Sequence, residues 1–261
     1  MILAIDTGNS HIVLGIIHQD GSIGPTMRME TNLTKTEYEY AADIKIILEL
    51  GRVDLSKCEG AIISSVVPPV TTVLKKAVKI LAGMDALVVG AGIRTGLDIG
   101  LDDPGTIGAD LVATAVAAKN FYKLPCIIID MGTATTITVV NEKGRYIGGC
   151  IMPGVAISLN ALTQGTSLLP SIDLVTPQKV IATNTIDAIK TGIIYGACGQ
   201  LDGVVDRFKK ELGVETSVVA TGGLAGLICP GCRHEITIDP DLLFRGLYVI
   251  WNKNHPKKRR T

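Results

Sequence analysis

Apolar and polar positions alternate in blocks at the start of the chain, and this pattern predicts a β-hairpin. An apolar run ends at residue 5, residues 6–10 read Asp-Thr-Gly-Asn-Ser, and a second, largely apolar run covers residues 12–17. Two such runs around a short polar turn are typical of a strand and its returning partner. The pattern recurs at residues 126–140, and the copies align at Asp6 with Asp130, Gly8 with Gly132 and Asn9 with Thr133. Two copies predict a duplicated architecture with a cleft between its halves.

The composition of the two turns fits phosphate binding. Gly8 and Gly132 allow a left-handed backbone and leave room for a phosphate to approach backbone N–H groups. An aspartate at a strand end, such as Asp6, holds a hard cation such as Mg²⁺ directly or through water. A single motif of this kind is most often a plain hairpin turn, but two matching copies favour phosphate binding. The short donors for phosphate oxygens are Asn9, Ser10, Thr133 and Thr135.

Strand-like and helix-like segments alternate along the rest of the chain. The predicted strands are residues 27–31, 59–67, 86–89, 216–220 and 235–238. The predicted helices are residues 36–50, 71–81, 155–162, 186–200, 204–212 and 241–250, and residues 148–154 are predicted as a loop. This alternation predicts an α/β layered fold, which we divide into halves at 1–118 and 119–261.

Asp110 stands in the first turn of an Ala-rich helix that follows a loop rich in Gly, Asp and Pro. In one interpretation it caps that helix. In the other it is a catalytic carboxylate, which orients a substrate hydroxyl and accepts its proton during phosphoryl transfer. The sequence alone leaves both open, and the two are compatible.

Composition narrows the classes of partner. The chain has 261 residues, of which 47% are hydrophobic, and its 25 basic residues balance 25 acidic ones. This balance gives no overall attraction to nucleic acid or membranes, and we interpret the basic segment 257–260 as a solvated terminus. No signal peptide or membrane-length apolar run is apparent, so we expect a cytoplasmic protein.

Six cysteines include a single C-x₂-C at Cys229 and Cys232. No second pair has the spacing of a zinc site. A reversible disulfide and an adventitious metal are alternatives, and a plain loop is the favoured interpretation.

Six ordered motifs then resemble those of the type III pantothenate kinases: D-x-G-N-[ST], G-A-D, D-x-G-T-A-T-T, G-G-x-I-x-P-G, N-T-x-x-A-I-x-x-G and T-G-G-x-A. The resemblance covers about residues 2–252 and implies the actin/hexokinase-like superfamily, with two ribonuclease-H-like halves and an interdomain cleft. It also implies a homodimer that phosphorylates the 4′-hydroxyl of pantothenate with ATP, Mg²⁺ and a monovalent cation, K⁺ or ammonium.

The resemblance also implies a role for each matching residue. Asp110 is the catalytic base, Asp6 lies near Mg²⁺ and Asp130 binds the monovalent cation. The implied ATP contacts are Asp6, Thr7, Gly8, Asn9, Ser10, His11, Ile12, Val13, Thr133, Gly222 and Gly223. The implied substrate contacts are Leu101, Gly108, Ala109, Asp110, Leu111 and Thr185. Taken in isolation, Thr185 is more typical of a helix cap.

Two positions depart from the family pattern. Leu111 replaces the usual Arg after G-A-D, and Leu101 replaces the usual Tyr before the Asp-Pro stretch. An Arg suits a substrate carboxylate by charge and fork geometry. Its loss typically costs several kcal/mol unless another cation replaces it. The candidates for that replacement are Arg94, Lys119, Lys123 and a residue of a partner subunit.

Three other functions therefore compete with pantothenate phosphorylation. One is an ATP-dependent kinase for a different small alcohol, which would explain both leucines. Another is a nucleotide-binding regulator without turnover, although the retention of Asp6, Asp110 and Asp130 argues against it. Simple hydrolysis of polyphosphate or nucleotide is a minor alternative.

Overall fold

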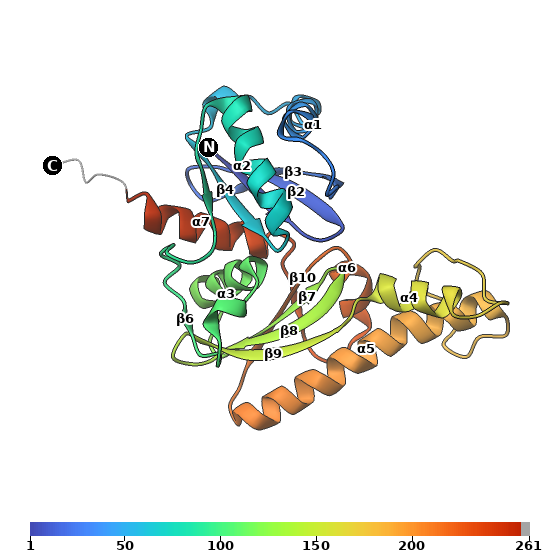
Figure 1. Cartoon of the computed structure of the whole chain (residues 1–261). Coiled ribbons are helices and arrows are strands. Elements are labelled where there is room, and N and C mark those ends of the chain that lie inside the picture. The colour runs from blue at the N-terminus through green and yellow to red at the C-terminus, as the bar shows by residue number, and fades with distance from the viewer. Residues whose placement is uncertain (257–261) are drawn as a thin grey trace. The chain divides into compact units, whose positions relative to one another are not determined.

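The computed structural model describes residues 1–256, so the basic segment 257–260 lies outside the described residues. The chain forms two compact units (Figure 1). Unit 1 contains Met1–Leu97, Asp102–Ala117 and residues 241–256, and unit 2 contains Asp98–Leu101 and Ala118–Pro240. Residues 241–256 were predicted as part of the second half, whereas their contacts group them with unit 1. The functional division at 118/119 stays a prediction.

Unit 1 is built on a five-stranded sheet with the order β3-β2-β1-β4-β5. Strands β1 and β2 form the predicted hairpin, β3 continues it antiparallel, and β4 and β5 add parallel strands on the other side of β1. The strands are β1 (Ile2–Thr7), β2 (His11–Ile17), β3 (Ile23–Glu30), β4 (Gly60–Ser65) and β5 (Ala86–Val88).

Unit 2 repeats this order. Its sheet runs β11-β10-β7-β8-β9-β6, so that β7 to β11 take the places that β1 to β5 take in unit 1. The strands are β6 (Asp98–Ile99), β7 (Cys126–Met131), β8 (Ala134–Val140), β9 (Arg145–Pro153), β10 (Ser217–Thr221) and β11 (Thr237–Ile238). The matching strand orders confirm the predicted duplicated α/β architecture.

Helices cover both faces of the unit 1 sheet. On one face, the buried side chains of β1, β2 and β4 form a core with α1 and α2. On the other face, Gly15 and Gly60 lie against the rings of Phe244 and Trp251 of α7, so closely that a Cβ on either glycine would collide with a ring. The helices are α1 (Glu37–Leu50), α2 (Pro68–Ala82) and α7 (Leu242–Asn254).

In unit 2, apolar side chains of β7, β8 and β10 form a core with α5 and α6. The helices are α4 (Val155–Gln164), α5 (Thr185–Leu212) and α6 (Ala225–Ile228). Helix α3 (Ala109–Phe121) follows the loop that joins β6 to the remainder of unit 1. Three short 3₁₀ helices complete the described chain: Leu55–Lys57, Pro104–Thr106 and Cys229–Gly231.

Two local predictions were wrong. The helix predicted at residues 71–81 begins earlier, because Pro68 and Pro69 open α2; proline fits the first helical turn, where its missing N–H is not needed. The predicted loop at residues 148–154 is mostly strand β9. Gly149 lies against the carbonyl of Ile137, so closely that a Cβ would collide with it, and this close approach explains glycine inside a strand.

Within residues 1–256, no helix has the length and apolarity needed to cross a membrane.

Candidate functional site

The first phosphate-binding candidate is the turn between β1 and β2. The Gly8 N–H donates to the His11 carbonyl at 2.9 Å and closes the turn. Thr31, directly after β3, anchors it from the side: its hydroxyl donates to the Gly8 carbonyl at 2.7 Å and its N–H to the Ser10 carbonyl at 3.0 Å. Thr31 was not predicted as a site residue, although its position as a polar residue at the end of the third predicted strand was an available signal.

A depression of about 510 Å³ lies beside this turn. Its lining is mostly polar: Asn9, Ser10, His11, Arg28, Met29, Glu30 and Thr31. The side chains of Thr7 and Ile12 are instead buried, at 1% and 0% exposure. A ligand could therefore contact these two residues only through their backbone atoms. Asn9, Ser10 and His11 are therefore the side chains of this motif that a phosphate can reach.

Asp6 and Asp110 belong to the same end of the unit 1 sheet. Asp6 is near the carboxyl end of β1, and the Val66 N–H, just past β4, donates to the Thr7 carbonyl at 3.1 Å. A Cβ built on Gly108 would lie 3.3 Å from Cγ1 of Val66. The loop that leads into α3 therefore packs where β1 and β4 end, and it brings Asp110 to that edge.

The Asp110 carboxylate is held by its own helix. Its Oδ1 accepts from the Leu111 N–H at 2.8 Å, a bond within the first turn of α3. A Cβ at residue 108 would collide with Oδ1, so any larger residue there would displace the carboxylate from this position. Burial raises the pKa of Asp110 above its ordinary value, and the Leu111 N–H opposes this only in part. A partly buried carboxylate with a raised pKa has the character of a general base.

The other predicted substrate contacts near Asp110 in the sequence do not all belong to the same unit. Ala109 is buried and Leu111 is half-buried in unit 1, next to Asp110. Leu101 belongs to unit 2, where its Cδ2 lies 3.6 Å from the position of a Cβ on Gly148. Among the candidate replacements for the missing Arg, Lys123 forms an ion pair with Glu215 at 2.9 Å.

The second hairpin, between β7 and β8, repeats the first. The Gly132 N–H donates to the Ala134 carbonyl at 3.1 Å, and Thr133 is exposed at the tip. Asp130 pairs in register with Thr136 of β8 and Thr221 of β10, so the three side chains share one face of the sheet. The Thr136 hydroxyl is buried and has no hydrogen-bond partner among the described residues. An unpartnered buried oxygen beside a carboxylate fits an oxygen-coordinated cation.

Two glycine segments approach the second hairpin. Gly222 has φ of +93°, and a Cβ there would lie 2.6 Å from the Met131 backbone. Gly154, which follows β9, lies against the Thr133 carbonyl, again with no room for a Cβ. Gly223 is exposed and has open space around its Cβ position. The segment after β10 therefore presents flat backbone beside the hairpin.

Thr185 is the first residue of α5 and is exposed. The interpretation of Thr185 as a helix cap is wrong, because the cap is Asn184. The Asn184 side chain accepts from the Asp187 N–H at 2.9 Å and donates to the Asp187 carboxylate at 2.8 Å. The Thr185 hydroxyl is thus not needed to cap the helix.

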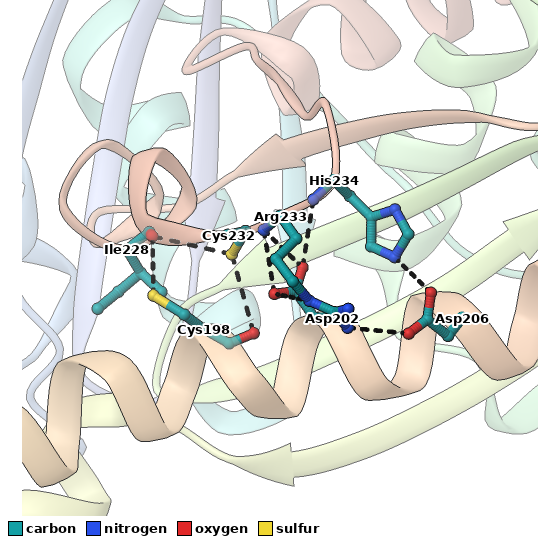
Figure 2. Close-up of polar contacts among 7 residues, drawn as sticks. All are labelled: Cys198, Asp202, Asp206, Ile228, Cys232, Arg233 and His234. Carbon is teal, nitrogen blue, oxygen red and sulfur yellow. Dashed lines mark hydrogen bonds and ion pairs between the residues drawn. The ribbon is translucent and has the colours of Figure 1, made fainter.

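The C-x₂-C motif lies in a 3₁₀ turn beside α5, and Figure 2 shows its surroundings. The thiols of Cys198 and Cys232 both donate to the Ile228 carbonyl, at 3.3 and 3.8 Å. All cysteines are free, and no group of three His, Cys, Asp or Glu side chains within residues 1–256 is placed to hold a metal. Burial raises the pKa of Cys229 to about 11, so its thiol stays protonated at neutral pH. These contacts hold the motif as a turn against α5, where a plain loop was predicted.

Comparison with known proteins decides between the families that share this architecture. A model of the type III pantothenate kinase family matches residues 2–207. The chain belongs to that family. A type III pantothenate kinase of Halalkalibacterium halodurans is 42% identical over 254 residues, which cover 97% of this chain and 100% of that relative. This family member is therefore a small-molecule kinase, as the resemblance implied.

Solved structures of lower identity share the fold. Component A of the (R)-2-hydroxyglutaryl-CoA dehydratase of Acidaminococcus fermentans matches with a TM-score of 0.57 at 16% identity, over 98% of this chain and 99% of that one. The activator of the 2-hydroxyisocaproyl-CoA dehydratase of Clostridium difficile, with bound ADPNP, matches with a TM-score of 0.53 at 10% identity, over 100% and 99%. The likeness shows a shared α/β fold, in agreement with the predicted actin/hexokinase type.

Proposed function

We propose that this kinase transfers the γ-phosphoryl group of ATP to the 4′-hydroxyl of pantothenate, the first step of coenzyme A biosynthesis. Membership of the family over residues 2–207 carries this proposal. The geometry of Asp110 supports it, because a partly buried carboxylate at a sheet edge is suited to deprotonate an alcohol.

The first hairpin would bind the ATP phosphates through Asn9, Ser10 and His11 and through the backbone of the turn, with Thr7, Gly8, Ile12 and Val13 forming its frame. Asp6 would hold Mg²⁺, directly or through water. The site fits this ion, since Asp6 pairs in register with Ser64, whose buried hydroxyl has no partner among residues 1–256. When bound, Mg²⁺ neutralises charge on the phosphate oxygens during transfer.

In the proposed reaction, Asp110 orients the acceptor hydroxyl and takes its proton. The hydroxyl oxygen forms a bond to the γ-phosphorus while the bond to the β,γ-bridging oxygen breaks, which gives the phosphate ester and ADP. The raised pKa of Asp110 makes its carboxylate a stronger base than an exposed aspartate. Gly108 would leave room for this carboxylate, and Ala109 and Leu111 would line the acceptor side.

The second hairpin would contact the nucleotide through Thr133, with Gly222 and Gly223 beside the adenosine. Asp130 and the unpartnered hydroxyl of Thr136 would hold the monovalent cation, K⁺ or ammonium. Thr185 would contact the acceptor. We also propose that the protein is a homodimer in the cytoplasm.

A kinase for another small alcohol is the second candidate. Leu101 and Leu111 favour it, because both replace polar residues of the family's pantothenate pocket with apolar ones. This alternative keeps every proposed nucleotide contact and changes only the acceptor.

The test is ADP formation with ATP, Mg²⁺ and K⁺, measured with pantothenate and with a panel of small alcohols. We expect pantothenate-dependent turnover by the unmodified protein. A Leu111→Arg variant serves as the comparison, since it restores the family's cation. Turnover with another alcohol in the panel, but not with pantothenate, would support the second candidate. Silence with every alcohol would contradict both kinase assignments and favour a regulator.

A further inference from the structure

Ser64, in β4, carries a hydroxyl that the fold leaves without a partner. Its side chain is 0% exposed, and its Oγ makes no hydrogen bond within the described part of the chain. Buried hydroxyls are nearly always hydrogen-bonded, since burial without a partner is unfavourable. Ser64 is one of four such hydroxyls among the described residues, with those of Thr7, Thr136 and Thr138, and its place next to a predicted site needs an explanation.

The neighbouring serine shows how differently the two hydroxyls are used. Ser65 Oγ accepts from the Thr71 hydroxyl at 2.6 Å and from the Val67 N–H at 3.1 Å, so it supports the start of α2. Successive residues of a strand point to opposite faces, so Ser64 faces away from α2. The Ser64 hydroxyl forms no such hydrogen bond to support the fold.

Strand register places Ser64 beside Asp6. The strands β1 and β4 are parallel, with Asp6 opposite Ser64 and Ala4 opposite Ile62. Partners in register project from the same face, so the Ser64 hydroxyl and the Asp6 carboxylate are neighbours on the face that α7 covers. Two residues further along, Val66 contacts the Gly108 position and thus the start of the Asp110 helix.

We propose that Ser64 is a positioning residue for the metal-bound state. When the divalent cation and its waters fix the Asp6 carboxylate, the Ser64 hydroxyl donates to one carboxylate oxygen and leaves the other for the cation or its water. Hydrogen bonds of this kind orient metal-ligating carboxylates, and their removal typically costs about 10–100-fold in metal affinity. The inference rests on the proposed role of Asp6.

The test is Mn²⁺ binding, measured by electron paramagnetic resonance in the presence of ADP, together with thermal unfolding without ligands. Ser64→Ala should weaken Mn²⁺ binding about 10–100-fold. It should leave the unfolding temperature of the ligand-free protein unchanged or higher, because it removes a buried hydroxyl that has no partner there. A merely structural hydroxyl would show the reverse pattern.

Thr138→Val is the matched control. The Thr138 hydroxyl is also buried without a partner among the described residues, but it belongs to β8 in the sheet of unit 2, not to the sheet that contains Asp6. This variant should keep wild-type Mn²⁺ affinity. Wild-type affinity in Ser64→Ala, or a large loss of ligand-free stability in that variant, would overturn the proposal.

Asp6→Asn separates this failure from failure of the proposed function. If Asp6→Asn loses Mn²⁺ binding while Ser64→Ala does not, Asp6 keeps its role and only the inference about Ser64 is wrong. If neither variant changes Mn²⁺ affinity, the metal assignment itself is wrong.

Discussion

At the scale of single residues, the burial that suits Asp110 to act as a base also lowers the stability of the folded protein at neutral pH. Burial raises its pKa, so the folded protein favours the protonated carboxyl more than the unfolded chain does. The stability that this preference contributes is complete below the unfolded pKa and is lost as the pH rises through the folded one. At neutral pH, where a base must be ionised, the folded state therefore holds an unfavourable charge.

Asp110→Asn should accordingly be more stable than the wild type at neutral pH. Asparagine keeps an oxygen for the Leu111 N–H but carries no charge to desolvate. The gain should shrink as the pH falls through the raised pKa of Asp110, because the wild-type carboxyl is then neutral as well. Thermal unfolding of both proteins across that pH range measures it. A variant that is less stable than the wild type at every pH would contradict the burial argument.

The sequence allowed candidate site residues to be named, but not the contacts around them. Asp6, Gly8 and Asp130 were predicted as site residues because their motif occurs twice with apolar strands on both sides. Thr31 and Ser64 were not, since the contacts that distinguish them come from strand pairing across more than 20 and 50 residues. A single sequence carries no direct signal for such pairs.

At the scale of elements, a buried carboxylate of the long helix α5 holds the segment that follows the 3₁₀ turn at Cys229–Gly231. Asp202 is 4% exposed and accepts from the backbone N–H groups of Arg233 and His234 (Figure 2). The Arg233 side chain adds a contact of 3.4 Å between its Nε and the carboxylate. This cluster fixes the segment between the 3₁₀ turn and β11.

Asp202→Ala should destabilise the protein by about 3 kcal/mol, because two backbone N–H groups lose a charged acceptor. The control is Asp206→Ala, one turn further along α5, which removes exposed contacts to Arg233 and His234 and should cost much less. Urea unfolding of both variants gives the comparison. Equal losses would show that the buried bonds to the backbone are not what stabilises the segment.

Prediction of the elements was most reliable where polar turns or capping residues mark their ends. The hairpins enclose their polar turns, and α1 begins at its cap Thr36 and ends at Gly51. The helices predicted at residues 186–200 and 204–212 form one continuous helix, α5, which begins at its cap Asn184. The strand β9 was missed because its glycines are also turn residues, and only packing against Ile137 shows why they suit a strand. The extent of α2 was missed because proline both ends strands and begins helices.

At the scale of the whole molecule, the sequence predicted the duplication, but it did not predict which sheet the final helix, α7, packs against. The two sheets share one strand order, as the repeated motif predicted. The last helix follows the second sheet in the chain but packs on the first, against Gly15 and Gly60. Nothing in its amphipathic pattern identifies which of two similar sheets it covers, because both offer an apolar face.

The central claim is that Asp110 is the base in phosphorylation of pantothenate. Its most direct measurement is steady-state ADP formation with pantothenate by Asp110→Asn and wild type, alongside ATP binding by calorimetry. We expect turnover to fall at least about 100-fold in the variant, as for loss of a general base, while ATP affinity stays near that of the wild type. Full turnover in Asp110→Asn would contradict the account.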